Sequence, residues 1–103
     1  MSYFSSDESA FGATDLAVRH PKMYRVLMHN DDYTTMEFVI EMLAKFFSKT
    51  LVEAEEITLA IHQKGLAVCG VYTEEIAETK VMQVHDNARK AGFPLRCSME
   101  EDG

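Results

Sequence analysis

Hydrophobic and polar positions between residues 24 and 47 predict a strand, a turn and a helix. The run 24–28 is short, apolar and rich in residues that favour strands. Asn30, Asp31 and Asp32 follow it, and such side chains favour turns because they hydrogen-bond nearby backbone groups. Apolar residues then recur at offsets of three or four, the spacing of a helix face that lies on a core. They are Met36, Val39, Ile40, Leu43 and Phe47.

Threonine residues predict where two helices begin. Thr34 with Glu37, and Thr50 with Glu53, fit a capping box, in which hydroxyl and carboxylate each satisfy a backbone N–H at the helix start. Gly65 is expected to end the second of these helices in a left-handed cap. The apolar stripe of this second helix consists of Leu51, Ala54, Ile57, Thr58 and Ile61.

Two more strands and a third helix complete the pattern. The run 66–72 predicts a strand, in which Gly70 indicates a bulge or a close contact. Thr73 is expected to cap the third helix, and Gly92 with Pro94 to end it. One side of this helix is predicted to carry Ile76, Thr79 or Lys80, Val84 and Ala88, with Ala77, Val81 and His85 adjoining them.

The last strand is predicted at 95–99, with residues 100–103 frayed. The resulting order is strand, helix, helix, strand, helix, strand. It predicts a small α+β domain in which a three-stranded antiparallel sheet packs with three helices on one or both of its faces.

Length and composition indicate a single domain. The chain has 103 residues, of which 47% are hydrophobic, enough for one modest core. Residues 1–20 show no sustained period and are expected to form a flexible N-terminal extension. The core domain is expected to span 21–103, because the His20-Pro21 step favours an extended boundary.

Charge and hydropathy exclude several classes of partner. The formal net charge is -7 and there is no basic cluster, which argues against nucleic acid. No apolar stretch approaches the roughly 20 residues of a membrane span, and the N-terminus lacks the features of a signal peptide. We therefore expect a cytoplasmic monomer that binds neither nucleic acid nor membrane, with Cys69 and Cys97 as buried, reduced thiols.

The acceptors Asn30, Asp31 and Asp32 fit two interpretations. They form turns readily, and beside a hydrophobic helix face they are also typical of a pocket with one polar rim. His62 completes such a rim if the chain brings the two regions together. A metal site that includes His29 is a weaker alternative, because neither His-x-x-x-His nor Cys-x-x-Cys occurs.

The sequence argues against an enzyme and indicates no cofactor. It has no Gly-x-Ser-x-Gly, phosphate loop or dinucleotide fingerprint. Cys69 with His62 is a conceivable nucleophile and base, yet a thiol in the middle of an apolar strand is typically inert. A small metal-dependent enzyme using Asp31, Asp32 and His62 remains the alternative from another functional class.

Four segments together resemble the ClpS family, the bacterial N-degron adaptors of the ClpAP protease. The likeness runs from about Pro21 to Met99 with the segments in the same order and spacing. The segments are Asn30-Asp31-Asp32-Tyr33-Thr34-Thr35-Met36-Glu37-Phe38-Val39, His62-Gln63-x-Gly65, Cys69-Gly70-Val71-Tyr72-Thr73 and Ala77-Glu78-Thr79-Lys80-Val81.

The resemblance implies a βααβαβ adaptor that binds the first residue of a substrate protein and hands the substrate to the ClpA unfoldase. It implies that Asn30, Asp31, Asp32 and His62 hold the free α-amino group. The side chain of a first residue such as Leu, Phe, Tyr or Trp would enter an apolar pocket. That pocket would be lined by Met28, Thr34, Met36, Val39, Thr58, Ile61 and Leu95.

The resemblance also assigns roles outside the pocket wall. It implies that Met36 disfavours β-branched first residues, and that Glu75 and Lys80 contact the N-terminal domain of ClpA. Residues 1–20 correspond to an extension that the family needs for substrate delivery.

Two positions depart from the family pattern. Thr35 stands where proline is common, so we expect a slightly softer turn. Thr58 stands where methionine is common, which predicts a deeper pocket with a hydroxyl in it and a changed preference among first residues. A paralogue with a narrowed or altered repertoire is therefore the alternative within this class.

Overall fold

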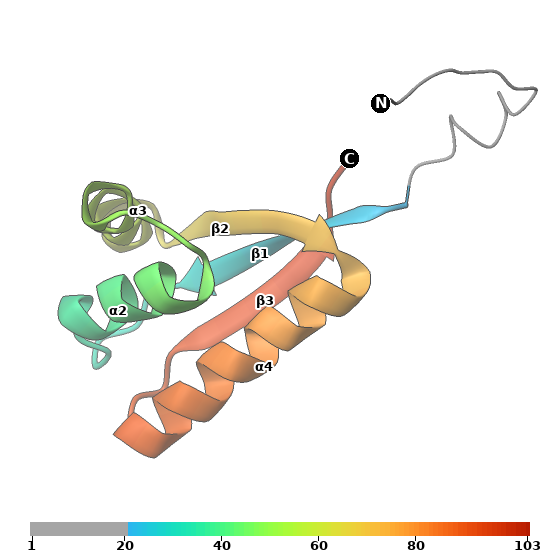
Figure 1. Ribbon diagram of the computed structural model, residues 1–103. Coiled ribbons are helices and arrows are strands. Elements are labelled where there is room, and N and C mark those ends of the chain that lie inside the picture. Colours follow the sequence, from blue (N-terminus) through green and yellow to red (C-terminus); the bar gives the residue numbers. More distant parts are fainter. Residues whose placement is uncertain (1–20) are drawn as a thin grey trace, which may run out of the picture.

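The computed structural model describes residues 21–103, and the predicted extension 1–20 lies outside the described residues. The α+β class and the predicted order of elements are confirmed (Figure 1). The elements are β1 (Met23–His29), α2 (Met36–Phe46), α3 (Leu51–Lys64), β2 (Leu66–Thr73), α4 (Glu74–Ala91) and β3 (Arg96–Glu101).

The three strands form an antiparallel sheet in the order β2-β1-β3, with β1 at its centre. The register of β1 and β2 shifts between Val26 and Leu27, which face Gly70 and Val68, so Cys69 is the extra residue of a bulge. A Cβ atom at Gly70 would overlap the Tyr72 ring. Both features predicted for this glycine, the bulge and the close contact, are therefore present.

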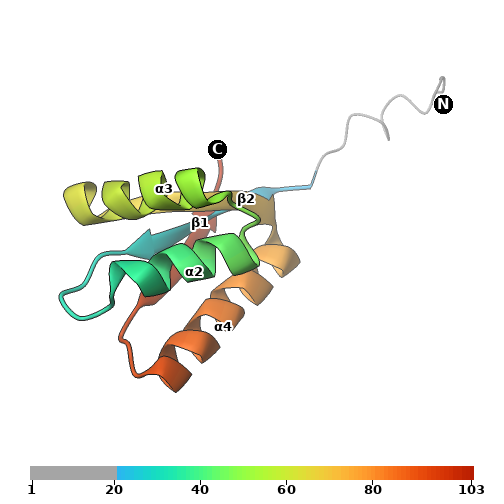
Figure 2. The same cartoon turned by 60° about the vertical axis from the view of Figure 1, so that its left-hand side comes forward.

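The core lies between the helices and one face of the sheet. Val26 and Met28 of β1 are fully buried there, whereas Val68 and Val71 of β2 are 42% and 41% exposed on the other face. Helix α4 runs alongside β3 (Figure 1) and contacts all three strands. Helix α2 lies between α3 and α4 (Figure 2), so it has neighbours on two sides.

The helix starts confirm one predicted cap and correct another. Thr50 and Glu53 form the predicted capping box at α3, and Gly65 ends that helix with φ 94°. The capping box predicted for Thr34 is wrong. The N-cap of α2 is Thr35, whose Oγ1 accepts from the backbone N–H of Phe38 at 3.1 Å. Thr73 occupies the N-cap position of α4, as predicted, but its side chain forms no capping hydrogen bond.

The predicted apolar stripes of the three helices are wrong in part. Ile76 is 48% exposed, and α4 instead buries Ala77, which shares its side with Val84 and Ala88. Leu51 is 62% exposed at the start of α3. Because α2 contacts two helices, it buries a wider face than the predicted stripe, and its buried residues are Phe38, Val39, Met42 and Leu43.

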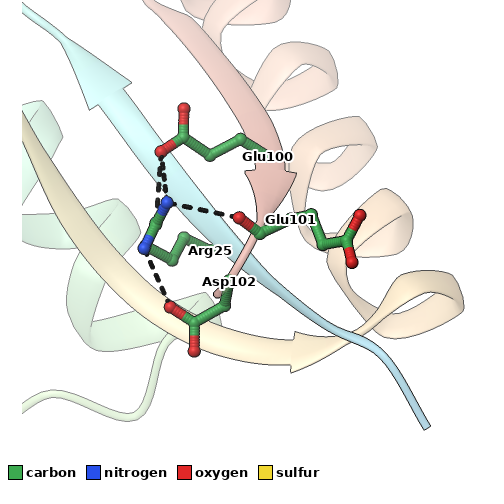
Figure 3. Close-up of polar contacts among 4 residues, drawn as sticks. All are labelled: Arg25, Glu100, Glu101 and Asp102. Atoms are coloured by element: carbon green, nitrogen blue, oxygen red, sulfur yellow. Dashed lines mark hydrogen bonds and ion pairs between the residues drawn. The ribbon is translucent and has the colours of Figure 1, made fainter.

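The predicted fraying of residues 100–103 is wrong for Glu100 and Glu101, which belong to β3. Arg25 holds this end of the chain (Figure 3). Its Nε and Nη2 donate to Glu100 at 3.1 and 2.8 Å, Nη2 also to the carbonyl oxygen of Glu101 at 3.2 Å, and Nη1 to Asp102 at 3.0 Å. The backbone N–H of Asp102 further donates to the carbonyl oxygen of Met23 at 2.8 Å.

No helix within residues 21–103 combines the length and apolar character needed to cross a membrane.

Candidate functional site

A pocket of about 280 Å³ lies among the turn after β1, the start of α2 and the second half of α3. It brings together all the residues predicted to hold an α-amino group and most of those predicted to surround a side chain. The lining residues are Asn30, Asp31, Asp32, Thr34, Met36, Val39, Thr58, Ile61 and His62.

Two residues predicted for the pocket are not among those found to line it. Met28 is fully buried near the end of β1, and Leu95 is 5% exposed just before β3. Both belong to the core cluster that also contains Val39 and Ile61. They lie in the core next to the lining residues, and their place in the pocket wall stays a prediction.

A backbone hydrogen bond ties the turn to the end of α3. The N–H of Asn30 donates to the carbonyl oxygen of Gly65 at 2.8 Å. Gly65 is the left-handed residue that ends α3, and His62 lies in the last turn of that helix. The turn acceptors and His62 consequently meet at one rim although they are about thirty positions apart in the sequence.

Asp31 organises the turn. Its Oδ1 accepts from the N–H groups of Tyr33 and Thr34 at 2.8 and 2.7 Å, and its Oδ2 accepts from the Thr34 hydroxyl at 2.7 Å. This arrangement occupies the Thr34 hydroxyl, which explains why Thr35 caps α2 instead. A carboxylate has about four acceptor positions, so one on Oδ2 remains available.

Hydrogen bonding keeps the Asp31 carboxylate ionised. Partial burial acts to raise its pKa, but the N–H and hydroxyl of Thr34 and the N–H of Tyr33 outweigh that effect, so the pKa lies below its ordinary value. The rim therefore carries a fixed negative charge at every pH near neutrality.

The pocket has a polar, exposed rim and a buried, apolar wall. Asn30, Asp32 and His62 are exposed at the rim, and Met36 at its edge is 46% exposed. The wall is formed by residues that are almost fully buried. These are Val39, Thr58 and Ile61, with 6%, 5% and 3% of their surface exposed.

The hydroxyl predicted to enter the pocket at Thr58 is already bonded within α3. Its Oγ1 donates to the carbonyl oxygen of Ala54, one turn earlier, at 2.7 Å. The wall therefore offers no hydrogen-bond donor at this position.

The structure gives little support to the two alternative sites, a metal site and a Cys69 nucleophile. Within residues 21–103, no three His, Cys, Asp or Glu side chains are grouped closely enough to hold a metal ion. His29 instead shares a hydrogen bond of 2.7 Å with Ser98 through its Nε2. The Cys69 thiol is 1% exposed, and burial raises its pKa to about 12, so it is a poor nucleophile.

Glu75 and Lys80 lie in the first half of α4 and do not line the pocket. Glu75 is exposed, and the Lys80 ammonium lies 5.6 Å from the centre of the Tyr72 ring. Both side chains thus lie on α4, outside the set of residues that line the pocket.

Sequence reasoning missed two contacts that build the site. One joins Thr34 to Asp31, for which the signal was an acidic residue three positions before a threonine at a helix start. The other is made by Gly65, whose carbonyl oxygen anchors Asn30. That contact carries no sequence signal because a backbone carbonyl is common to all residues.

Comparisons with known proteins agree on one family. The family described as ATP-dependent Clp protease adaptor protein ClpS matches residues 19–98. The adapter protein ClpS of Nitratidesulfovibrio vulgaris (strain Miyazaki F) is 61% identical over 84 residues, covering 82% of this chain and 84% of that protein. The ClpS of Lawsonia intracellularis is 60% identical over 84 residues, covering 82% of this chain and 77% of that protein.

A solved structure is similar as well. It is the structure of Agrobacterium tumefaciens ClpS2 bound to L-phenylalaninamide, with a TM-score of 0.78 and 37% identity. The likeness covers 81% of this chain and 100% of that one.

Proposed function

The chain belongs to the ClpS family of adaptor proteins of the ATP-dependent Clp protease, and we propose that it acts there by reading the first residue of substrate proteins. In this proposal it binds the free α-amino group and the side chain of an N-terminal Leu, Phe, Tyr or Trp, and delivers the substrate to the ClpA unfoldase. The observation that carries the proposal is a single pocket with acceptors at its rim and a buried apolar wall.

The rim suits an ammonium group. A free α-amine has a pKa of about 8 and is mostly protonated near neutral pH, with three N–H donors and no acceptor. The Asn30 amide oxygen, the Asp31 or Asp32 carboxylate and a ring nitrogen of His62 supply acceptors. An internal peptide bond has one N–H and no charge, so such a rim favours chain ends over internal segments.

The wall suits one large apolar side chain. The volume of about 280 Å³ lies close to the lower end of the roughly 300–1,000 Å³ of small-ligand pockets, which suits the side chain of one residue. L-phenylalaninamide, the ligand of the Agrobacterium tumefaciens ClpS2 structure, combines a free α-amine with a phenyl side chain. That likeness supports the same ligand class here. Met36 at the edge would disfavour β-branched first residues.

The expected binding free energy is compatible with transient binding of a substrate. Burial of a Leu or Phe side chain contributes about 1.5–3 kcal/mol, and each charge-assisted hydrogen bond about 1.5–3 kcal/mol. Loss of translational and rotational freedom offsets part of this sum. We expect micromolar or somewhat tighter binding.

Delivery requires contacts beyond the pocket. Glu75 and Lys80 are proposed to bind the N-terminal domain of ClpA, because their place on α4 leaves the pocket open to a substrate. Residues 1–20 are proposed to act after docking. Deleting them is expected to leave peptide binding unchanged and to slow degradation by ClpAP, whereas degradation at the full rate would reject that role.

The direct test is fluorescence anisotropy with short labelled peptides that begin with Phe, Leu, Tyr, Trp, Ile or Ala. Each peptide is measured with a free and with an acetylated α-amine. We expect free Phe, Tyr, Trp or Leu termini to bind, Ile and Ala termini to bind much more weakly, and acetylation to abolish binding.

Two other outcomes are informative. Binding of only one or two of these first residues would favour the alternative of a paralogue with a narrowed repertoire. Binding that survives acetylation would reject the ammonium site.

A further inference from the structure

Thr58 is exceptional among the buried residues of the part of the chain from 21 to 103. It is the only buried side chain there that carries a polar group, with 5% of its surface exposed. It also lines the pocket. A single hydroxyl in an apolar wall has two possible uses, as a hydrogen-bond partner for the ligand or as a compact filler that sets the depth of the wall.

The hydrogen bond within α3 removes the donor role and leaves Oγ1 only as an acceptor. The Thr58 hydroxyl gives its only proton to the carbonyl oxygen of Ala54 at 2.7 Å. This bond holds the Oγ1 atom against the helix backbone, as is common for threonine within helices. A ligand therefore finds no donor at Thr58, and none in the flanking side chains of Val39 and Ile61.

The wall is rigid as well as apolar. Val39, Thr58 and Ile61 are all β-branched, and branching at Cβ restricts rotation about χ1, especially in helices. All three lie in helices and are less than a tenth exposed. Met36 at the mouth is unbranched and 46% exposed, so it can rearrange around a ligand. The wall residues thus fix the depth of the pocket, and only Met36 at its opening can adjust to a ligand.

We propose that Thr58 determines which first residues this protein prefers through the space it leaves for large aromatic side chains, and not through a hydrogen bond donated by its hydroxyl. This inference rests on the proposed function and makes it more specific. The preferred substrates are those whose first residue is Phe or Trp, and the selection depends on the volume at position 58.

The test is a volume series at one position, measured with peptides that differ only in a first residue of Phe, Trp, Tyr or Leu. Thr58→Val keeps the shape and removes the hydroxyl, so it is the matched control, and we expect the affinity ratios to stay within twofold. Thr58→Met adds volume to the wall, and we expect the Phe:Leu and Trp:Leu affinity ratios to fall tenfold or more. Thr58→Ala removes volume, and we expect the Trp:Leu ratio to rise.

Circular dichroism and thermal unfolding establish that each variant is folded, and the Ala variant keeps the test decisive if Met at this position disturbs α3. A change of more than fivefold in the Tyr:Phe ratio of Thr58→Val would overturn the inference, because it would show that the hydroxyl takes part. Unchanged ratios in both Thr58→Met and Thr58→Ala would also overturn it. Failure of the unmodified protein to bind any peptide would instead reject the proposed function.

Discussion

Two acidic clusters lie at opposite ends of the central strand β1, and their surroundings differ. The terminal cluster, Glu100 and Asp102, lies beside the start of β1, where Arg25 forms ion pairs with both carboxylates at 2.8 and 3.0 Å. The turn cluster, Asp31 and Asp32, follows the end of β1. No lysine or arginine within residues 21–103 forms an ion pair with it.

This difference in ion pairing indicates a structural role for the terminal cluster and is consistent with the binding role proposed for the turn cluster. In the terminal cluster, Arg25 supplies the cation and the result is a longer β3. In the turn cluster, backbone N–H groups and one hydroxyl hold Asp31 in its ionised form and leave the rim without a counter-ion from the described chain. In the proposed function the cation is the ammonium group of the ligand, and the adjoining apolar wall receives the side chain attached to it.

The largest expected effect comes from removing the turn cluster. Asp31→Ala deletes a charge at the rim and the acceptor of three hydrogen bonds. At about 1.5–3 kcal/mol for each charge-assisted bond, we expect peptides with a free N-terminal Phe to bind about 10- to 100-fold more weakly in anisotropy titrations. The matched control is Glu100→Ala in the terminal cluster, for which binding should not change. Equal losses in the two variants would remove the distinction between the clusters.

Alkaline pH is expected to weaken binding by a similar or smaller amount. Because the pKa of Asp31 lies below its ordinary value, its carboxylate does not titrate between pH 7 and 9.5. The α-amine of the peptide does, with a pKa of about 8, so affinity should fall about 30-fold by pH 9.5. Constant affinity across this range, with the protein folded by circular dichroism, would show that the rim does not require an ammonium group.

Breaking the terminal cluster should affect stability and leave binding intact. Arg25→Gln removes two ion pairs whose side chains are one-third to one-half exposed, and exposed pairs contribute up to about 1 kcal/mol each. We expect the midpoint of thermal unfolding to fall by about 4–8 °C, with unchanged affinity for Phe peptides. A loss of affinity without a loss of stability would contradict this division.

The smallest expected effect is on stability in acid. The folded-state pKa of Asp31 is lowered, so its stabilising contribution is present above the ordinary pKa of an aspartate and is lost as the pH falls through the folded value. Urea unfolding should therefore show a smaller loss of stability between pH 5 and 3 in Asp31→Asn than in the unmodified protein. Because Asp31 is partly exposed, the difference should be modest. An identical pH dependence would mean that the turn bonds do not favour the ionised form.

Local hydrogen-bond patterns account for most of what the sequence predicted correctly. The capping box of Thr50 and Glu53 and the left-handed cap at Gly65 depend only on neighbouring residues. The polar turn beside an apolar helix face was likewise evident. His62 was a candidate for the same rim, and the family resemblance supplied the rest of the pocket, including Thr58; the structure brings both residues to the same cavity.

The errors arise where distant contacts choose between locally equivalent options. Thr34 and Thr35 both fit a helix start, and the geometry of Asp31 decides between them. The end of β3 depends on Arg25, which lies 75 positions earlier than Glu100. The assignment of Met28 and Leu95 to the pocket wall stays a prediction, because both are buried in the same core cluster as the lining residues and such burial cannot be distinguished from pocket lining by residue type.

In the proposed function, the turn cluster and the apolar wall together bind one first residue. The most direct measurement is titration of the isotopically labelled protein with L-phenylalaninamide, followed by two-dimensional NMR of its backbone amides. We predict saturable shifts at Asn30, Thr34, Ile61 and His62, with no change at Val68 and Val71 on the open face of the sheet. Shifts confined to that open face, or no shifts at all, would contradict the claim.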